Sequence, residues 1–450
     1  MSKVHFHRLS YDPCSPLMAS PLSSPATSIS SPLEPGHSTA LPKPLEPPSL
    51  GPQTPSSPST SAQQPGKPLT QDKDLSFLLD PSIYHPLSQL DIPLPLRQQL
   101  PSPPTADTPL PDSLARLDTL LSNGKFLSVA SLAASILVSG SVRPNDSKTI
   151  FDLLALRYSC LELTGNSLLA AQESKALGDL NSAFYYVDQP SQSRDMGDTK
   201  AEPPLQENII PFSLRLQALR LQAIGFSDPR RGVSALYDLG LECREHAASP
   251  FVTSEDREVW SSRLSEIGIK VVNALIEMGD LDCATRTLTS IKPSNPKNAS
   301  IWKMRMVLLY LKIGDLSEAQ KLMQGLNGTG GQVNLLQPLL AFAEGRYEEA
   351  ALAWEKSLEN GLPNEEAVLA KQNLAVACLY SGQIERTKEI MEGLIDEGNS
   401  FQSLLLNLAT LYELGSDKSR ELKAALADRV AQQEASSERG WTKTNADFKL

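Results

Sequence analysis

Five stretches between residues 271 and 426 decide the fold, because they repeat one local design. In each stretch an apolar helical segment ends near a glycine, one or two polar residues follow, and a second amphipathic segment begins. They read VVNALIEMGDLDCATRTL (271–288), VLLYLKIGDLSEAQKLM (307–323), LLAFAEGRYEEAALAW (339–354), AVACLYSGQIERTKEIM (375–391) and LATLYELGSDKSRELKAAL (408–426). The recurrence predicts an array of helix pairs.

The spacing of the turn glycines identifies the kind of array. Gly279, Gly314, Gly345, Gly382 and Gly415 lie 35, 31, 37 and 33 residues apart, with a mean of 34. That period is typical of the tetratricopeptide repeat. A glycine suits the turn because it ends a helix in a left-handed conformation without a side-chain clash.

Two further positions follow each glycine at fixed distances. Five residues after it comes a small residue, which lets two antiparallel helices approach closely. This position holds Ala284, Ala319, Ala350, Thr387 and Arg420, so the fifth repeat departs from the pattern. Nine residues after the first four glycines lie large apolar residues that fill the groove against the next repeat, Leu288, Met323, Trp354 and Met391. We therefore expect a buried set consisting of Ala284, Ala319, Ala350, Trp354 and Leu358.

Weaker copies of the design precede this array. Gly124, Gly165 and Gly225 each follow an apolar helical segment, but spacings of 41, 60 and 54 residues show that linkers intrude. We interpret 112–250 as degenerate helical repeats with a linker at 190–211, 251–435 as the tetratricopeptide array, and 436–450 as a C-terminal extension. The predicted fold is an all-α tetratricopeptide-repeat helical solenoid.

The N-terminal part differs in composition from the array. Of the 35 prolines, 24 lie in residues 1–111, a density that excludes regular helices. Residues 1–73 have too few apolar side chains to offset the entropy of ordering, which predicts a long disordered Pro/Ser-rich tail. Eight Ser-Pro or Thr-Pro steps occur up to Thr108, close to what this composition gives by chance, so phosphorylation of the tail is left open.

An apolar, proline-rich docking segment occupies residues 74–111. Its core, DLSFLLDPSIYHPLSQLDIPLPLRQQLP (74–101), is rich in leucine but interrupted by five prolines. Apolar side chains in such a segment need a surface to cover them. The sequence leaves two alternatives open: a cap on the chain's own helices, or a partner that binds the anchors Phe77, Leu78, Leu79, Ile83 and Tyr84.

Charge and cysteine content exclude several classes of protein. The net charge is −11, without the basic concentration that nucleic acid or a charged membrane surface requires. The longest apolar stretch, 126–138, is too short to span a bilayer, and the N-terminus lacks the apolar run of a signal peptide. Five scattered cysteines without CxxC spacing fit a reducing compartment. We expect a cytoplasmic protein without direct membrane insertion.

The sequence predicts no catalytic, cofactor-binding or metal-binding residues. Four of the five histidines, His5, His7, His37 and His85, lie in the N-terminal residues 1–111, which leaves His246 alone in the helical part. Trp302, Tyr310, Trp354 and Tyr380 fall at helical packing positions, where we expect core side chains. The chain is therefore predicted not to be an enzyme.

Repeat arrays bind peptides and protein surfaces along a concave face. A clamp for a terminal carboxylate would place a Lys ten residues and an Asn six residues before the turn glycine. Before Gly279 these positions hold Ile269 and Asn273, so this clamp is absent. A less specific contact surface on the first helices would include Lys270, Asn273 and Arg305.

The proline-rich tail, the segment FLLDPSIYHPLSQLDIPLP and the repeat array together resemble the tetratricopeptide-repeat subunit 12 family of TRAPP, the trafficking protein particle complex. The similarity covers about residues 74–435. The resemblance implies an accessory scaffold in a vesicle-tethering complex that is also a guanine-nucleotide exchange factor for Rab GTPases.

From this resemblance we expect other TRAPP subunits as partners and a Rab GTPase as an indirect one. It also implies a peripheral location at early secretory membranes, in ER-to-Golgi traffic and autophagy. The alternative is a tetratricopeptide adaptor of another assembly, of the ubiquitin ligase or kinetochore type. The sequence does not choose the contacting residues or the stoichiometry.

Overall fold

A computed structural model describes residues 73–90, 92–105, 108–186, 208–250, 252–291, 299–324 and 331–433. Within these residues the chain forms helices α1 to α16, and the single extended pairing is an isolated bridge between Tyr186 and Asn208. The all-α class is confirmed. Apart from Lys73, the predicted tail lies outside the described residues, as do the extension 436–450 and most of the linker 190–211.

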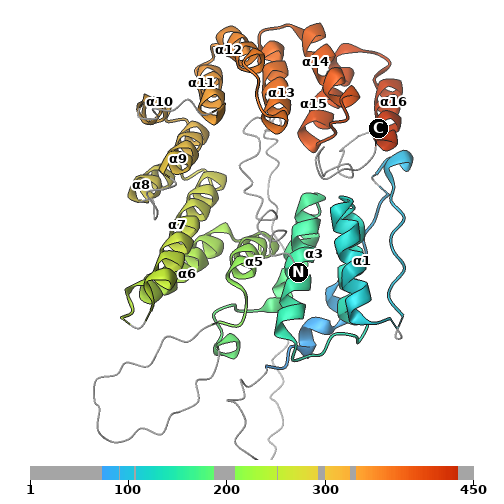
Figure 1. The fold of residues 1–450 in the computed structure, drawn as a ribbon, viewed down its shortest axis with the longest axis vertical. Coiled ribbons are helices and arrows are strands. Elements are labelled where there is room, and N and C mark those ends of the chain that lie inside the picture. Colours follow the sequence, from blue (N-terminus) through green and yellow to red (C-terminus); the bar gives the residue numbers. More distant parts are fainter. Residues whose placement is uncertain are drawn as a thin grey trace, which may run out of the picture. The chain divides into compact units, whose positions relative to one another are not determined.

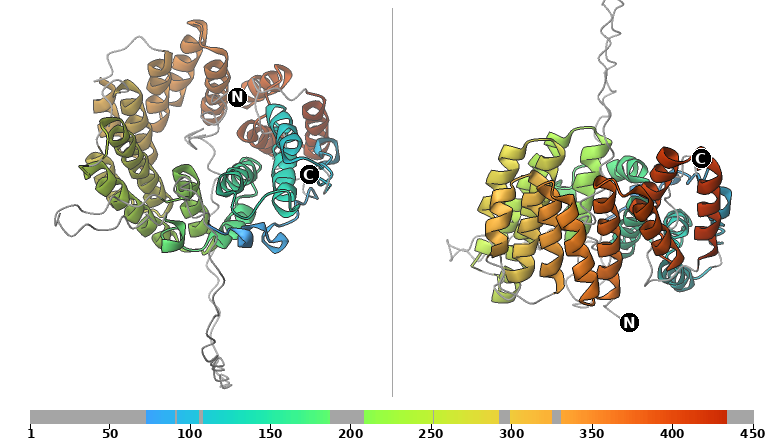
Figure 2. Two further views of the ribbon diagram at one scale, coloured as in Figure 1. Left: turned by 60° about the horizontal axis from the view of Figure 1, so that its bottom comes forward. Right: turned by 90° about the horizontal axis from the view of Figure 1, so that it is seen from above.

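Consecutive helices are joined by short turns into pairs (Figure 1). The pairs are α1 (Leu110–Ser122) with α2 (Phe126–Val138), α3 (Ser147–Leu163) with α4 (Ser167–Ser174), α5 (Phe212–Gly225) with α6 (Pro229–Ala248), α7 (Ser254–Glu277) with α8 (Leu281–Ser290), α9 (Ala299–Ile313) with α10 (Leu316–Gln324), α11 (Gly331–Ala343) with α12 (Tyr347–Glu359), α13 (Asn364–Tyr380) with α14 (Ile384–Asp396), and α15 (Gln402–Gly415) with α16 (Ser419–Gln432). Figure 2 shows neighbouring helices lying side by side in rows.

The turn glycines have the backbone conformation that the repeat design predicts. Positive φ angles between 76° and 94° occur at Gly279, Gly314, Gly345 and Gly382. At Gly279, the Gly279 N–H donates to Ile276 O at 3.0 Å and the Asp280 N–H donates to Leu275 O at 2.9 Å. These two bonds satisfy the last carbonyls of α7. The Asp280 carboxylate then caps α8 by accepting from the Cys283 N–H at 3.1 Å.

The last pair has a different register, as its sequence suggested. Gly415 is the final residue of α15 and lacks a positive φ. Helix α16 starts four residues after it, whereas α8, α10, α12 and α14 start two residues after their glycines. The shift leaves Arg420 exposed, and Leu426 and Ala427 fill the buried face of α16.

Most of the predicted core positions are buried. Ala284, Ala319 and Ala350 have no exposed surface, and Trp354 is 1% exposed. Trp302 is half-buried and packs against the largest apolar cluster. Two expectations were wrong. Leu358 is only half-buried, because the adjacent Ser357 takes the buried position at the end of α12.

Tyr380 is the second exception, since it is 54% exposed. It ends α13, beyond the part of the helix that neighbours cover, and contacts other aromatic rings at the surface. Its ring centroid lies 5.1 Å from that of Tyr347 and 5.3 Å from that of Phe342.

The upstream pairs follow the same plan with weaker sequence signals. Gly124 and Gly165 have positive φ angles of 66° and 72° at the turns of the first two pairs. In the third pair the positive φ falls on Ser227, at 54°, instead of Gly225. Gly225 has another role, because a Cβ there would lie 2.5 Å from the Ala171 carbonyl oxygen of α4. The domain boundaries predicted from the sequence stay predictions.

Buried apolar side chains form three clusters along the helices. The largest extends from α1 to α11, a second lies around Trp354 on α11 to α13, and a third lies on α13 to α16. Two of them also contain residues from before α1: Leu75 and Leu78 belong to the first cluster, and Leu96 to the third. The segment before the helices is therefore part of the folded core.

Candidate functional site

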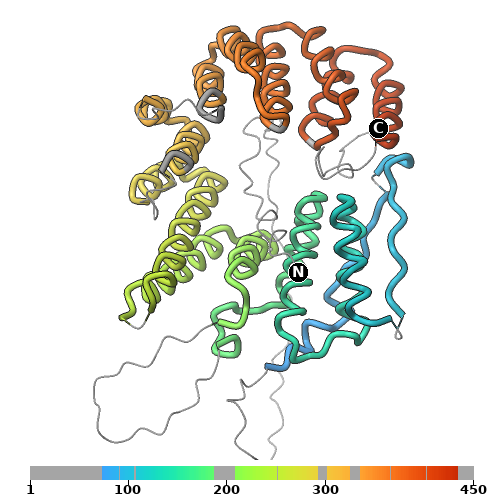
Figure 3. Tube along the Cα trace, in the orientation of Figure 1, coloured from blue at the N-terminus to red at the C-terminus, as the bar shows by residue number. Residues whose placement is uncertain are grey.

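The apolar segment at 74–101, here termed the strap, lies against helices of its own chain. Its prolines break it into three short 3-10 helices, η2 (Ser76–Leu79), η3 (Pro81–Ile83) and η4 (Leu94–Leu96). Figure 3 traces it (blue) from the helices near α3 to a turn beside α16, from which the chain returns to α1. Contacts between η4 and α16, and between η2 and α2, agree with this path.

The first half of the strap is anchored in the largest core cluster. Leu75 is fully buried and Leu78 is 1% exposed. The Leu75 N–H donates to the carbonyl oxygen of Pro144, before α3, at 2.8 Å. The Tyr84 hydroxyl donates back to the Leu78 carbonyl at 2.5 Å, which closes the segment on itself.

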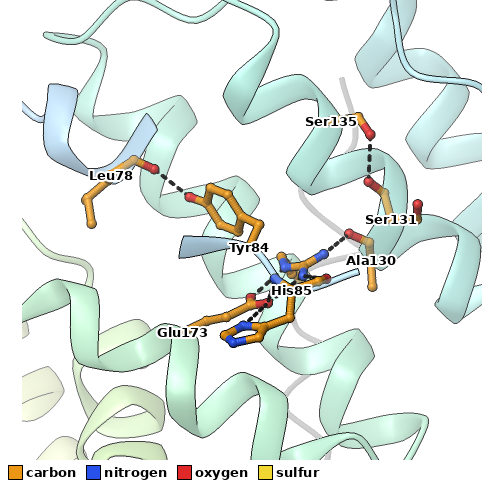
Figure 4. A network of polar contacts seen from close by, with 8 residues as sticks. Leu78, Tyr84, His85, Ala130, Ser131, Ser135 and Glu173 are labelled. Atoms are coloured by element: carbon orange, nitrogen blue, oxygen red, sulfur yellow. Dashed lines mark hydrogen bonds and ion pairs between the residues drawn. The ribbon is translucent and has the colours of Figure 1, made fainter. Parts of the chain in front are cut away.

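A buried ion pair holds the end of this half (Figure 4). Arg157 on α3 and Glu173 on α4 are 1% and 0% exposed, and two guanidinium nitrogens, Nη2 and Nε, each lie 2.6 Å from a carboxylate oxygen. The guanidinium also donates to the His85 carbonyl at 3.1 Å and the Ala130 carbonyl at 2.6 Å. In return, the His85 N–H donates to Glu173 at 2.9 Å. A buried ion pair is tolerated only when further hydrogen bonds satisfy it, and the strap supplies two of them.

Two phenols and a thiol near this pair are held in their neutral forms. Burial raises the pKa of Tyr84, and the negative charge of Glu173 raises it further. Burial likewise raises the pKa of Tyr158 well above its ordinary value, and that of the Cys160 thiol to about 12. A thiol of this pKa is not a nucleophile at neutral pH. The cluster is suited to docking the strap and not to proton transfer or covalent chemistry.

The second half of the strap forms a loop closed by its own hydrogen bonds. This proline loop, residues 89–98, begins and ends at two glutamines that bond reciprocally. The Gln89 side-chain amide donates to the Gln98 carbonyl at 2.8 Å, and the Gln98 N–H donates to Gln89 Oε1 at 2.8 Å. Leu96 is 7% exposed and packs, with Ile92, in the cluster that includes α16.

The five strap residues that the sequence predicted as partner anchors differ in how exposed their side chains are. Phe77 is 41% exposed and its ring lies 6.0 Å from that of Phe184. Leu79, Ile83 and Tyr84 are half-buried. The prediction that Leu78 is a partner anchor was wrong, because a side chain that is 1% exposed in the core is not available to a partner in the folded chain.

Two leucines that the sequence did not single out are more exposed than any of these. Leu90 and Leu94, both on the proline loop, are 80% and 75% exposed. No signal in the sequence distinguishes them from Leu78 or Leu96, because all four lie in the same apolar, proline-rich composition.

The second predicted surface lies on α7 and α9. Lys270 and Asn273 on α7 are half-buried, and Arg305 on α9 is exposed. The structure adds Lys312 of α9, whose ammonium group donates to Asn273 Oδ1 at 3.3 Å. This bond joins the first helices of two successive pairs and presents polar side chains of both.

Inside the described ranges, no three His, Cys, Asp or Glu side chains converge as metal ligands would. Of the two histidines described, His85 has Nδ1 3.6 Å from Glu173, and His246 stacks on Trp260 with ring centroids 4.2 Å apart. A groove of about 240 Å³ runs between the strap and α2, but Arg157 and Tyr84 in its lining already have hydrogen-bond partners.

Helix length also bears on membrane contact. Among the helices that the structure describes, none combines the length and the apolar character needed to cross a bilayer.

Comparison with known proteins finds two relatives that carry the same name. The chain is 26% identical over 262 residues to "Trafficking protein particle complex subunit 12" of Homo sapiens, a match that covers 52% of this chain and 35% of that protein. It is 25% identical over 262 residues to the protein of the same name from Mus musculus, with 52% and 32% covered. No family model matches the sequence. The chain spans about a third of the length of these curated relatives.

These matches agree with the resemblance that the strap and the 34-residue array suggested from the sequence. They rest on about half of the chain and on two relatives that share a single name. Over about half of its length, the chain is similar to these two proteins named trafficking protein particle complex subunit 12.

Proposed function

We propose that this chain is a non-catalytic accessory subunit of a TRAPP-like complex. The observation that carries the proposal is the similarity, over half of the chain, to two proteins named as subunits of that complex. In this role the chain is a scaffold that joins other subunits. Vesicle tethering and nucleotide exchange on a Rab GTPase, in ER-to-Golgi traffic and autophagy, would be activities of the whole assembly.

The helix pairs suit such a role because each added pair extends the surface available to partners. Two regions are proposed as contact sites: the strap, and the α7–α9 surface with Lys270, Asn273 and Arg305. In this proposal the chain is cytoplasmic and reaches early secretory membranes only through the other subunits.

Affinity purification of the full chain from its own cells, followed by mass spectrometry, tests the proposal. We expect the other subunits of a TRAPP-like complex to be recovered in constant ratio. A set of ubiquitin ligase or kinetochore proteins in their place would contradict the proposal and support the adaptor alternative.

A second experiment tests the proposal that the chain alone does not catalyse nucleotide exchange. The chain alone, added to a Rab GTPase loaded with labelled GDP, should not accelerate nucleotide release. The purified complex serves as the positive control. Acceleration by the chain alone would contradict the scaffold role.

A further inference from the structure

Helix α16 is packed against two elements, and one of them precedes α1 in the sequence. Among the described residues, only α15 and η4 of the proline loop pack extensively on α16. The apolar cluster around α16 consists of residues from α11 to α16 and their connections, apart from Leu96 and Ile92 of the loop. In this cluster Leu96 is 7% exposed, and Val430 of α16 is fully buried. Leu96 and Ile92 therefore supply part of the apolar cover of the last helix pair.

The stem of the same loop is attached to the first helix pair. Ser128 on α2 is 1% exposed, and its hydroxyl donates to Gln98 Oε1 at 3.2 Å. The side chain of Gln89 joins the two ends of the loop, because it both donates to and accepts from the backbone of Gln98 at 2.8 Å. The tip of the loop, which Figure 3 shows beside α16, is therefore linked through its stem to α2.

Bonds within the loop hold it in one conformation. Arg97 donates through Nε to the Ile92 carbonyl at 2.8 Å and through Nη2 to the Leu90 carbonyl at 3.1 Å. The rings of Pro93 and Pro95 fix two φ angles near the tip. A segment restrained in this way loses little conformational entropy when it docks, so its stem and its tip are held in place together.

The repeat design does not itself join the two ends of an array. Each pair packs on its neighbours in sequence, so a pair at the end lacks one neighbour and opens more readily than the others. Within the described ranges, no helix of the first three pairs packs extensively on α15 or α16. The proline loop takes the place of the missing neighbour of the last pair, and it comes from the opposite end of the array.

We propose that the proline loop is a clasp that couples the first helix pair to the last. Attachment of the stem to α2 keeps the tip at a high effective concentration near α16, so that release of the stem loosens α15 and α16. A partner that displaces the stem from α2 therefore also opens the last pair. This inference goes beyond the proposed function and concerns the chain alone, so it does not depend on membership of a complex.

Hydrogen exchange of the purified full chain tests the clasp, with mass spectrometry of peptides from α15–α16 and, as a reference, from α7–α8. The stem variant Gln89→Ala/Gln98→Ala leaves the apolar side chains of the tip intact. It removes the two bonds between the ends of the loop and the bond to Ser128. We expect exchange in α16 to become at least about fivefold faster, and exchange in α7–α8 to be unchanged.

A tip variant and two matched controls complete the comparison. Ile92→Ala/Leu96→Ala should accelerate exchange in α16 at least about tenfold, because it removes apolar cover directly. Coupling between two sites is reciprocal, so the same variant should also accelerate exchange of the Gln98 N–H. The controls are Leu94→Ala, at a side chain 75% exposed on the same loop, and Gln217→Ala, which removes two side-chain bonds between α5 and α3. Both controls should leave exchange in α16 at the wild-type rate.

The outcomes that oppose the clasp are distinct from those that support it. Wild-type exchange of α16 in the stem variant would overturn it, and the loop would then be a local cap on α16. Wild-type exchange of the Gln98 N–H in the tip variant would overturn it as well. If the stem variant exchanges faster in every helix alike, the single variant Gln98→Ala decides the matter. Acceleration confined to α15–α16 in that variant supports the clasp, and wild-type exchange there overturns it.

Discussion

The two halves of the strap have nearly the same composition and opposite placements. In residues 75–86, Leu75 and Leu78 are buried in the main core, and the backbone of His85 completes a buried ion pair. Among the described residues of the proline loop, Pro93 and Leu96 are buried, and Leu90 and Leu94 remain in solvent. Both halves combine leucines with prolines, so composition alone does not determine which half is core and which is surface.

The two halves differ in burial because they contact different side chains of the helices. The first half lies over Arg157 and Glu173, whose charges would cost free energy if left incompletely bonded. The second half packs in the cluster that includes α16 through Leu96 and Ile92. Gln89 and Gln98 bond each other within the loop, and the Gln98 side chain accepts from Ser128 on α2 at 3.2 Å. We therefore interpret the first half as part of the fold, and the second as a surface element mounted on it.

The largest expected effect comes from breaking the ion pair under the first half. Glu173→Gln leaves Arg157 charged and buried, so the free energy of unfolding should fall by about 3–5 kcal/mol. The control is Glu349→Gln, whose exposed pair with Arg346 should contribute less than about 1 kcal/mol. Urea denaturation of both variants provides the measurement, and equal losses would mean that the pair does not anchor the strap.

Truncation of single leucines contrasts the two halves directly. Leu78→Ala should lower the free energy of unfolding by about 2–5 kcal/mol, because it leaves a cavity in the core. Leu94→Ala should change it by less than about 0.5 kcal/mol, because that side chain is 75% exposed. A large loss for Leu94→Ala would show that the proline loop is also part of the core.

Alkaline pH should destabilise the chain, in part through the groups under the first half of the strap. The folded-state pKa values of Tyr84 and Tyr158 lie above their ordinary value of 10.0, so the folded chain holds protons that the unfolded chain releases. The Cys160 thiol, whose pKa is raised from 9.0 to about 12, acts in the same direction. The free energy of unfolding should therefore begin to fall near pH 9 and fall more steeply above pH 10.

Urea midpoints between pH 8 and pH 11 measure this dependence. Tyr84→Phe removes one of the ionising hydroxyls and should flatten the slope. Other buried groups retain the remainder, among them Tyr158, Cys160 and Tyr185; burial raises the pKa of Tyr185 to about 12. A midpoint that does not change with pH in this range would contradict the assigned burial of the tyrosines.

The smallest expected effect concerns the chain before the strap. Deletion of residues 1–70 should leave the melting temperature unchanged, since this proline-rich composition offers no apolar face to the array. Differential scanning calorimetry of the full and shortened chains is the measurement. A clear destabilisation would show that these residues support the strap.

The periodic part of the fold was predictable because each feature has a local cause. A glycine must adopt positive φ at the turn, and an alanine must lie where two helices cross, so spacing alone located Gly279, Ala284 and Ala350. Prediction failed where the local pattern lacked information about neighbours. Tyr380 sits beyond the covered part of its helix, and the positive φ expected at Gly225 falls on Ser227.

The strap was less predictable for the same reason. Its apolar residues indicated that something must cover it, but Arg157 and Glu173, which lie 72 and 88 residues from His85 in the sequence, hold its first half in place. Neither residue carried a recognisable motif. Lys312 was missed likewise, because its bond to Asn273 depends on the packing of α7 and α9.

The central claim is that the strap is folded onto the array and is not a free linear segment. Amide hydrogen exchange of the full chain, resolved for Leu75, His85 and Gln98, tests it most directly. The N–H groups of these residues donate to Pro144, Glu173 and Gln89. We predict protection of Leu75 and His85 close to that of α3, and weaker protection of Gln98. Exchange of all three at the rate of an unstructured peptide would contradict the account.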